Sequence, residues 1–468
     1  MADLPEVTEG PAEEQPRRIQ TKRGVLVFDW ETISEELLPW ATKGGLALVD
    51  QGFISGSNFL ISILLARWLL PGQYGAYAIA YGVFLLLSML YGSLLLEPMG
   101  VFGGAAYRGC LRGYLGALLW IHLVIAVLIF SLLGVSAGVA RVIGQGNGLP
   151  GALAGVTVAA PCILLFWLAR RTFYVELSPA RAAIGSALYC AVVLGALFLL
   201  YRYGLLSPFT AFLLMGLGSL ATGVLLLFYL KSTLQPSASA PSVRQAWKRH
   251  WEYGRWALAG NVASWVPAYI FYPLLSGFHT LAQAGQLRAL MNFVLPLAQT
   301  QAALSMLLIP YAARVNARAG KSGSAALAVK VTLLSAAATL AYWAVIIPFR
   351  GPVFRFLYHG QYSEFTYLIP IVAIGSVFWA AAYGSSILLR AMESPDSIFA
   401  AFCAATVISL VVGVPATWAL GLSGAVWAIT LSDVASFFMV VYLLRRKVAG
   451  ASIEPGSPLA AKVEAGGL

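Results

Sequence analysis

The sequence predicts an all-α polytopic membrane protein with about twelve transmembrane helices, arranged as two six-helix lobes around a central cleft. Three observations lead to this prediction. The 468 residues are 59% hydrophobic and only 10% charged, whereas soluble domains are about 25% charged. Long stretches contain no Asp, Glu, Lys or Arg, and the longest is Ser397–Ser432. The basic residues concentrate in alternate loops, as the topology of a membrane protein requires.

The N-terminal segment, 1–43, is expected to be a cytoplasmic tail. Residues 1–24 are polar and mixed in charge, and they lack the apolar core of a signal peptide. Residues 25–40 mix aromatic and acidic side chains, which is typical of a short helix in the membrane interface.

The apolar stretches after this tail divide into twelve expected spans. A spanning helix needs about 20 mostly apolar residues, and Gly, Pro and aromatic residues mark the boundaries. The expected spans are 46–68, 77–97, 113–133, 151–169, 182–201, 207–230, 256–277, 288–309, 327–349, 367–389, 398–420 and 422–444.

The longest interior polar segment, 231–255, is rich in Pro and Ser and then basic. It separates an expected N-lobe, 44–230, from an expected C-lobe, 256–447. We therefore interpret it as a basic cytoplasmic linker. The remaining residues, 448–468, are rich in Gly, Ala and Pro and are expected to form a disordered cytoplasmic tail.

The positive charges predict the orientation. With twelve spans, both termini lie on one side, which carries all but 6 of the 30 Lys and Arg residues. The six on the other side are Arg67, Arg141, Arg202, Arg288, Arg350 and Arg355. Both termini are therefore expected to be cytoplasmic. The net charge of +11 follows from this topology and requires no nucleic-acid partner.

The two lobes show a weak internal repeat. A shift of 210 residues aligns Gln51 with Asn261, Gln73 with Gln283 and Gly75 with Gly285. The aligned segments open each group of six helices in the same orientation. This predicts a parallel repeat about an axis along the membrane normal, and a transporter with a cleft between two bundles.

Enzyme motifs are scarce. No two of the four histidines have the spacing of metal ligands, and the four cysteines do not pair by spacing. A Gly-x-Ser-x-Gly pattern at Gly134–Gly138 follows a membrane span instead of the strand that its chemistry requires. No loop is long enough for a soluble catalytic domain. The sequence therefore predicts neither an enzyme nor a metal or other cofactor.

Three acidic residues at membrane depth are candidates for ion coupling, because such charges are costly and usually functional. Asp433 lies in the middle of the last span, Asp50 about one turn into the first, and Glu97 at the end of the second. Pairing of Asp50 or Glu97 with Arg108 or Lys43 is the structural alternative.

Two arginines and four amides at membrane depth are candidate substrate-binding residues. Arg67 ends the first span and Arg288 opens the eighth, where an arginine either binds substrate or anchors the helix at the interface. The amides either line a polar cavity or join helices to one another. They are Asn58, Asn261, Asn292 and Gln299.

Several segments resemble one family of transporters. The first two helices contain Leu48-Val-Asp-Gln-Gly-Phe-Ile-Ser-Gly-Ser-Asn-Phe59, Leu65-Ala-Arg-Trp-Leu-Leu-Pro-Gly-Gln-Tyr-Gly-Ala-Tyr77 and Leu94-Leu-Leu-Glu-Pro-Met-Gly100. They resemble bacterial polysaccharide (O-antigen type) flippases of the multidrug/oligosaccharidyl-lipid/polysaccharide exporter superfamily. Leu357-Tyr-His-Gly-Gln-Tyr362 and Gly421-Leu-Ser-Gly-Ala-Val-Trp427 are similar to that family too. The resemblance covers approximately residues 44–447.

The resemblance implies a function. Such a flippase moves polyprenyl-diphosphate-linked oligosaccharide from the cytoplasmic to the periplasmic leaflet of the bacterial inner membrane, for lipopolysaccharide O-antigen or exopolysaccharide. Its partners would be this glycan, membrane lipids, and the glycan polymerase and export machinery.

A mechanism by alternating access would suit the two lobes. Arg67 and Arg288 would attract the anionic headgroup, and Arg108 and Arg112 would gather it at the cytoplasmic mouth, since guanidinium groups fit phosphate.

Other classes remain open. A cation-coupled multidrug exporter of the same superfamily is one alternative. Such exporters usually rely on acidic residues in the N-lobe, and the expected helices three to six here carry none, although Asp50 in the first helix keeps this alternative open. A membrane-embedded glycan polymerase or ligase would normally carry a large periplasmic loop, and the longest here, 134–150 and 350–366, are short. A passive scaffold is a further alternative.

Overall fold

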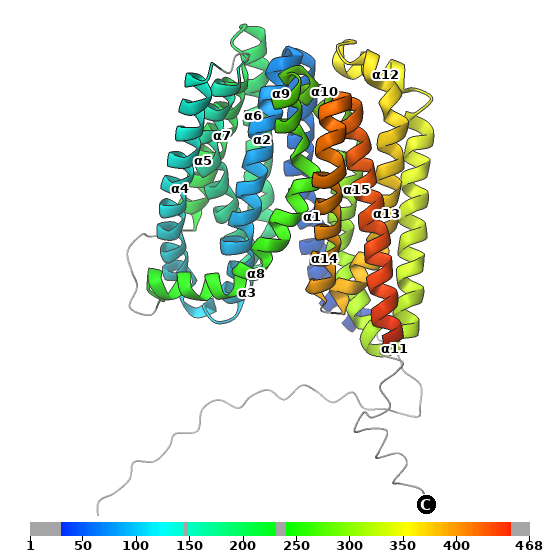
Figure 1. Ribbon diagram of the computed structural model, residues 1–468. Coiled ribbons are helices and arrows are strands. Elements are labelled where there is room, and N and C mark those ends of the chain that lie inside the picture. Colours follow the sequence, from blue (N-terminus) through cyan, green and yellow to red (C-terminus); the bar gives the residue numbers. More distant parts are fainter. Residues whose placement is uncertain (1–29, 145–147, 231–239, 393, 451–468) are drawn as a thin grey trace, which may run out of the picture. The chain divides into compact units, whose positions relative to one another are not determined.

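The computed structural model describes residues 30–144, 148–230, 240–392 and 394–450, and these ranges are helical without any strand. Contacts divide the chain into two units, Met1–Gly45 and Leu46–Leu468. The described part of the first unit is the beginning of α1. The second unit is a bundle in which the long helices run side by side (Figure 1).

The first half of the chain forms helices whose starts are set by proline. Pro71, Pro179 and Pro208 stand at the first position of their helices, where the missing N–H costs no hydrogen bond. The elements are α1 (Trp30–Trp68), α2 (Pro71–Tyr91), the π-helical η1 (Gly92–Leu96), α3 (Glu97–Gly104), the 3-10 turn η2 (Arg108–Cys110), α4 (Leu111–Val142), α5 (Leu149–Val175), α6 (Pro179–Arg202) and α7 (Pro208–Tyr229).

The second half begins at a capped helix end. The Ser242 Oγ accepts a hydrogen bond from the backbone N–H of Gln245, whose side chain accepts one from the backbone of Ser242. The elements are α8 (Val243–Tyr269), α9 (Phe271–Phe278), α10 (Leu281–Met291), α11 (Leu295–Ile346), α12 (Arg350–Tyr358), η3 (Ser363–Leu368), α13 (Ile369–Ala391), α14 (Pro395–Ile408), η4 (Ser409–Gly413) and α15 (Val414–Gly450).

Nine stretches of the described chain are long and apolar enough to cross a membrane, which agrees with a multi-pass membrane protein. One of them, Asp396–Val448, contains both of the last two expected spans, which meet at a kink where Gly421 has φ 57° and ψ −131°. The expected spans 256–277 and 288–309 are not among the nine. The first is divided between α8 and α9, and the second is interrupted by a turn at 292–294 before Pro296 opens α11.

One expected connection is helical instead. Residues 310–326, predicted to join the eighth and ninth spans, belong to α11, which is helical from Leu295 to Ile346. This segment is rich in alanine, the strongest helix former. Its helical propensity explains the difference.

The helices of the larger unit form two groups. In the first, α5 packs against α2, α4, α6 and α7, and in the second, α13 packs against α11, α14 and α15. We call the first group, together with α1, the N-lobe, and the second group, together with α8, α9 and α10, which pack against α14 and α15, the C-lobe. Helix α2 joins them through its contacts with α8 and α10.

The contact between α2 and α10 reproduces the predicted repeat. A Cβ added to Gly75 would lie 1.7 Å from the carbonyl oxygen of Leu281, and one added to Gly285 would lie 2.3 Å from that of Pro71. A shift of 210 residues converts the first contact into the second. Such a reciprocal contact is what two elements make across a two-fold axis, so the structure supports the repeat.

The beginning of α8 lies across the end of the N-lobe next to α3 (Figure 1). His250 is fully buried there. Its Nδ1 lies 2.8 Å from the carbonyl oxygen of Leu94, and its Nε2 lies 2.5 Å from the hydroxyl of Tyr114. The guanidinium of Arg249 stacks on Phe102 at 4.6 Å. Burial lowers the pKa of His250, which favours the neutral ring that these two contacts use.

Candidate functional site

Arg288 is the most buried charge of the C-lobe among the described residues. It lies on α10 and is 5% exposed, with its guanidinium 5.0 Å from the centre of the Tyr81 ring. Its Nε has no hydrogen-bond partner, and no salt bridge of the described chain includes it. A buried cation without a carboxylate partner is costly. It is therefore a strong candidate for a binding group.

Aromatic hydroxyl groups surround this arginine. Tyr74 of α2 and Tyr272 of α9 each share a side-chain hydrogen bond with Arg288, Tyr81 of α2 lies under its guanidinium, and Tyr269 at the end of α8 lines the same cavities. The sequence analysis missed these tyrosines. Their spacing is the signal that could have revealed them. Tyr74 and Tyr81 are seven positions apart and Tyr269 and Tyr272 three, and residues at such spacings share one helix face.

A small cavity lies between the two lobes beside Arg288, and we call it the interlobe cavity. Its volume is about 100 Å³. Side chains of α1, α2, α8, α10 and α11 line it, and the polar ones are Ser55, Asn58, Tyr81, Tyr269, Arg288 and Gln299. Three predicted site residues, Arg288, Asn58 and Gln299, are thus brought together. The Ser55 hydroxyl donates to Gln299 Oε1 at 2.8 Å, which joins α1 to α11.

A larger cavity, of about 320 Å³, lies within the C-lobe, and we call it the C-lobe cavity. Arg288 lines this cavity too, so its side chain borders both spaces. Asp433 of α15 also lines it, and the described chain gives this carboxylate no salt bridge. Two predicted residues of opposite charge, 145 positions apart in the chain, therefore share one cavity.

Asp50 has a different environment. Its buried carboxylate forms a salt bridge of 2.5 Å with Arg170 of α5 and accepts further hydrogen bonds from the hydroxyls of Tyr174 and Ser186. The structure gives Asp50 a partner that the sequence did not suggest, Arg170, because α5 and α6 pack an arginine and two hydroxyls against this turn of α1. The site joins three helices of the N-lobe.

Arg67 and two of the predicted amides connect elements of the two halves of the chain. Arg67 donates to the carbonyl oxygen of Phe356 at 3.2 Å and contacts His359. Asn261 donates to Ser93 Oγ at 2.5 Å.

The amide of Asn292 is buried in a network of hydroxyl groups. Its Oδ1 accepts from Ser62 at 2.8 Å, and its Nδ2 donates to the hydroxyls of Tyr74 at 3.0 Å and Tyr358 at 3.3 Å. Its polar atoms are thus used in joining α1, α2 and α12.

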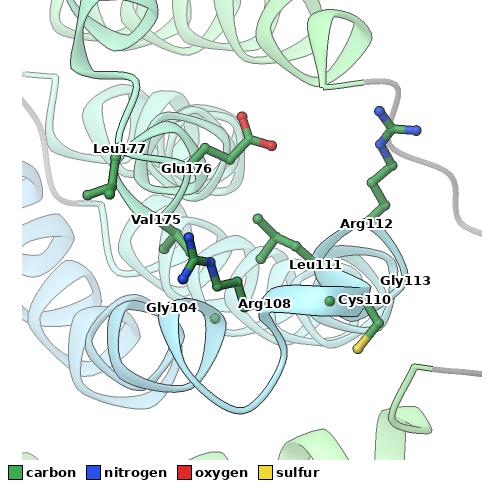
Figure 2. A pocket seen from close by; sticks show the side chains of 11 residues that line it. Gly104, Arg108, Cys110, Leu111, Arg112, Gly113, Val175, Glu176 and Leu177 are labelled. Atoms are coloured by element: carbon green, nitrogen blue, oxygen red, sulfur yellow. The ribbon is translucent and has the colours of Figure 1, made fainter. Parts of the chain in front are cut away.

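Arg108 and Arg112 border a surface pocket of about 740 Å³ between the α3–α4 connection and the end of α5. Figure 2 shows their side chains and that of Glu176 around this pocket. All three are exposed. Glu97 is exposed as well and begins α3, where its charge interacts with that of Arg171.

No protein-family model and no curated protein matches this sequence. Solved structures nevertheless share its fold. A multidrug resistance MATE family transporter of the MOP superfamily, in an inward-facing conformation, aligns with a TM-score of 0.70 and 14% identity over 88% of this chain and 100% of its own.

Two further solved structures are similar. The lipid II flippase MurJ, in an inward closed conformation, aligns with a TM-score of 0.68 and 13% identity over 86% of this chain and 87% of its own. A MOP superfamily transporter from Pyrococcus furiosus aligns with a TM-score of 0.62 and 13% identity over 88% of this chain and 95% of its own. At such identities the likeness establishes the fold alone, which this chain shares with these three transporter structures.

Proposed function

We propose that this chain is a membrane transporter that flips polyprenyl-diphosphate-linked oligosaccharide from the cytoplasmic to the periplasmic leaflet of the bacterial inner membrane, for surface polysaccharide biosynthesis. One observation carries the proposal. Arg288 presents a buried guanidinium with an unpartnered Nε to a cavity between the two lobes. The similarity of the fold to a lipid II flippase supports it.

The chemistry of Arg288 favours an anionic ligand. A guanidinium has five donors and no acceptor, and its fork matches phosphate oxygens. Phosphate brought between the lobes would supply a counter-charge, since no carboxylate of the described residues forms a salt bridge with Arg288. Asn58 and Gln299, in the same cavity, offer amide groups of the kind that bind sugar hydroxyls.

Arg108 and Arg112 would gather the headgroup before it reaches this cavity. Both are exposed at one surface pocket, on the side that the loop charges assign to the cytoplasm together with the two termini. Arg67 is engaged by Phe356 and His359. We therefore assign Arg67 to holding the opposite end of the lobes together, and headgroup binding to Arg288.

Transport would proceed by alternating access, with the lobes rocking about the contact between α2 and α10. Asp433 is the strongest of the three predicted acids for ion coupling, because it faces a cavity without a salt bridge. Asp50 is engaged by Arg170, and Glu97 is exposed at the start of α3. Membrane lipids and the glycan polymerase and export machinery would be the partners.

The decisive experiment uses a strain lacking the protein. Polyprenyl-diphosphate-linked glycans are extracted and tested for access to a glycan-modifying probe from the periplasmic side. The proposal expects complete repeat units shielded on the cytoplasmic side, with surface polysaccharide lost. Trapped units that the periplasmic probe reaches would instead indicate a polymerase or ligase, and normal glycan would contradict the proposal.

Variants of Arg288 test the site itself. Arg288→Gln removes the charge and is expected to lower surface glycan at least tenfold, since charge-assisted hydrogen bonds contribute about 1.5–3 kcal/mol. Arg288→Lys keeps the charge but loses the forked geometry of the guanidinium. Its surface glycan is expected to lie between that of the unmodified protein and that of Arg288→Gln. Arg355→Gln, on exposed α12, is the matched control. Unchanged glycan in Arg288→Gln at normal protein levels would exclude the headgroup role.

A cation-coupled multidrug exporter is the second candidate function. The observation favouring it is the C-lobe cavity, in which Asp433 lies with Trp379, Tyr269 and Tyr272, since aromatic rings and a carboxylate bind organic cations. A multidrug transporter shares the fold. This function predicts efflux that Asp433→Asn abolishes and a null strain with normal surface glycan, so the same strain distinguishes the two.

A further inference from the structure

The C-lobe cavity carries opposite charges at two separate points. Arg288 reaches it from α10 and Asp433 from α15. The two do not form a salt bridge, so their charged atoms are more than 4.0 Å apart. Two opposite charges that border one space without pairing leave both available to a ligand that spans them.

The end of the cavity at Asp433 offers acceptors. Thr430, one helical turn before Asp433, donates its hydroxyl proton to the carbonyl oxygen of Ile371 at 3.0 Å. Ser376 of α13 donates to the carbonyl oxygen of Ala373 at 2.9 Å and accepts from Trp343 Nε1 at 2.6 Å, which leaves one lone pair of its oxygen for a further donor. Because these protons are engaged, the hydroxyl oxygens can only accept further hydrogen bonds. Together with the carboxylate they favour an ammonium group.

Space is left for the carboxylate by a glycine. A Cβ added to Gly375 of α13 would lie 3.1 Å from Asp433 Oδ2, closer than most such contacts allow. Any larger residue at 375 would press on the carboxylate and equally on the Cα and hydroxyl of Thr430, both also 3.1 Å from that Cβ.

At the Arg288 end the charged group offers only donors, beside the hydroxyls of Tyr269 and Tyr272. Arg288 is 5% exposed and its Nε is unpartnered. A phosphate or carboxylate oxygen satisfies this group. The volume of about 320 Å³ falls within the range of roughly 300–1,000 Å³ that is usual for small-molecule sites.

We infer that the C-lobe cavity is a binding site for a small zwitterion, whose anionic group binds Arg288 and whose ammonium group binds Asp433. Such chemistry has two sources, a free metabolite or the headgroup of an aminophospholipid. This ligand is distinct from the lipid-linked glycan of the proposed function. Its binding is measured on purified protein, so its failure would leave the proposed transport untouched.

The test measures binding of O-phosphoethanolamine to the purified full chain by isothermal titration calorimetry. Ethanolamine and inorganic phosphate, each carrying one of the two charges, are the comparison ligands. Phosphoethanolamine is expected to bind at least tenfold more tightly than either, since each end adds a charge-assisted hydrogen bond.

Variants test which end of the C-lobe cavity binds which charged group of phosphoethanolamine. In Asp433→Asn the advantage of phosphoethanolamine over phosphate is expected to disappear, while phosphate binds as before. Gly375→Ala is expected to weaken phosphoethanolamine binding in the same selective way, which keeps the test valid if Asp433→Asn does not fold. The matched control is Asp396→Asn, because that exposed carboxylate lies outside the cavity, and it is expected to bind all three ligands normally.

Three results would overturn the inference. They are equal affinity for ethanolamine and phosphoethanolamine, equal affinity for phosphate and phosphoethanolamine, and no saturable binding at 10 mM, roughly ten-thousandfold weaker than an ordinary micromolar site. Repeating the titration in nanodiscs identifies the source. Loss of binding in phosphatidylethanolamine discs but not in phosphatidylglycerol discs would assign the site to the lipid headgroup, and equal binding in both to a free zwitterion.

Discussion

At the scale of single residues, charges at membrane depth in this protein have two kinds of environment. Asp50 is satisfied completely, by Arg170 and by two hydroxyls. Arg288 and Asp433 border cavities and have no salt bridge within the described chain. The first arrangement stabilises the contact between helices. The second leaves charge available for a ligand.

The structural role of Asp50 gives a stability prediction. Asp50→Asn leaves the guanidinium of Arg170, whose side chain is only 15% exposed, without its counter-charge, and breaking a buried pair costs about 3–5 kcal/mol. We expect a large fall in the thermal unfolding temperature of the purified protein. Asp396→Asn is the control, because the pair of Asp396 with Lys447 is exposed and such pairs contribute only about 0–1 kcal/mol. Equal effects of the two substitutions would contradict this interpretation.

At the scale of elements, the approach of α2 to α10 depends on glycine. The carbonyl oxygen of Leu281 occupies the position that a Cβ of residue 75 would need. Small residues at such a crossing let two backbones pack closely within a membrane. The crossing is a direct contact between the two lobes.

Gly75→Ala is therefore expected to destabilise the protein by about 1–3 kcal/mol or more through overpacking. Gly52→Ala is the matched control. No atom lies within 4 Å of a Cβ at Gly52, and alanine in a helix interior is favoured by about 1 kcal/mol over glycine. Thermal unfolding of the two variants should thus move in opposite directions, and a shared direction would argue against the crossing.

The beginning of α8 gives a pH prediction. Burial lowers the pKa of His250 in the folded protein below its ordinary value, so the unfolded chain binds the proton more readily. The stability contributed by His250 is complete above a pH of about 6.5, and it is lost as the pH falls, by at most about 1.4 kcal/mol per pH unit.

The measurement compares thermal unfolding at pH 7.5 and pH 5.5. His250→Gln is expected to lose less stability on acidification than the unmodified protein does. His279→Gln changes an exposed histidine and is expected to keep the full loss. If His250→Gln retained the same pH dependence as the unmodified protein, the buried ring would not be its source.

At the scale of the whole molecule, alternating access requires the two lobes to move against each other. Ser55 of α1 and Gln299 of α11 are joined by a hydrogen bond of 2.8 Å across the interlobe cavity. In a background without the native cysteines, a short bifunctional thiol reagent linking Ser55→Cys to Gln299→Cys is expected to stop transport, measured as surface glycan. A reducible reagent should restore it on reduction.

A link within one lobe is the control for this experiment. Ser409 and Ser432 both belong to the C-lobe, with their hydroxyl oxygens 2.8 Å apart. Linking cysteines at these two positions is expected to leave transport intact. Transport that continues with the lobes linked would rule out rocking between them.

The sequence by itself determined the membrane-embedded helical fold, because apolar length and the absence of charge are local properties of the chain. It also indicated the repeat, through Gly75 and Gly285, and it selected Arg288 and Asp433 by their cost at membrane depth. Helix breaks at 292–294 and the continuity of α11 were decided by local backbone propensities that hydropathy does not measure.

Only the tertiary structure decided which charges are satisfied. Asp50 and Asp433 are both acids within apolar helices, yet Arg170 reaches the first, whereas no arginine of the described ranges forms a salt bridge with the second. The environments of the predicted amides also differ. Asn58 and Gln299 line the interlobe cavity, whereas Asn292 is engaged in a buried network of hydroxyl groups. The reason is physical. The partner of a polar group is set by how distant helices pack, and no local pattern in the chain encodes that geometry.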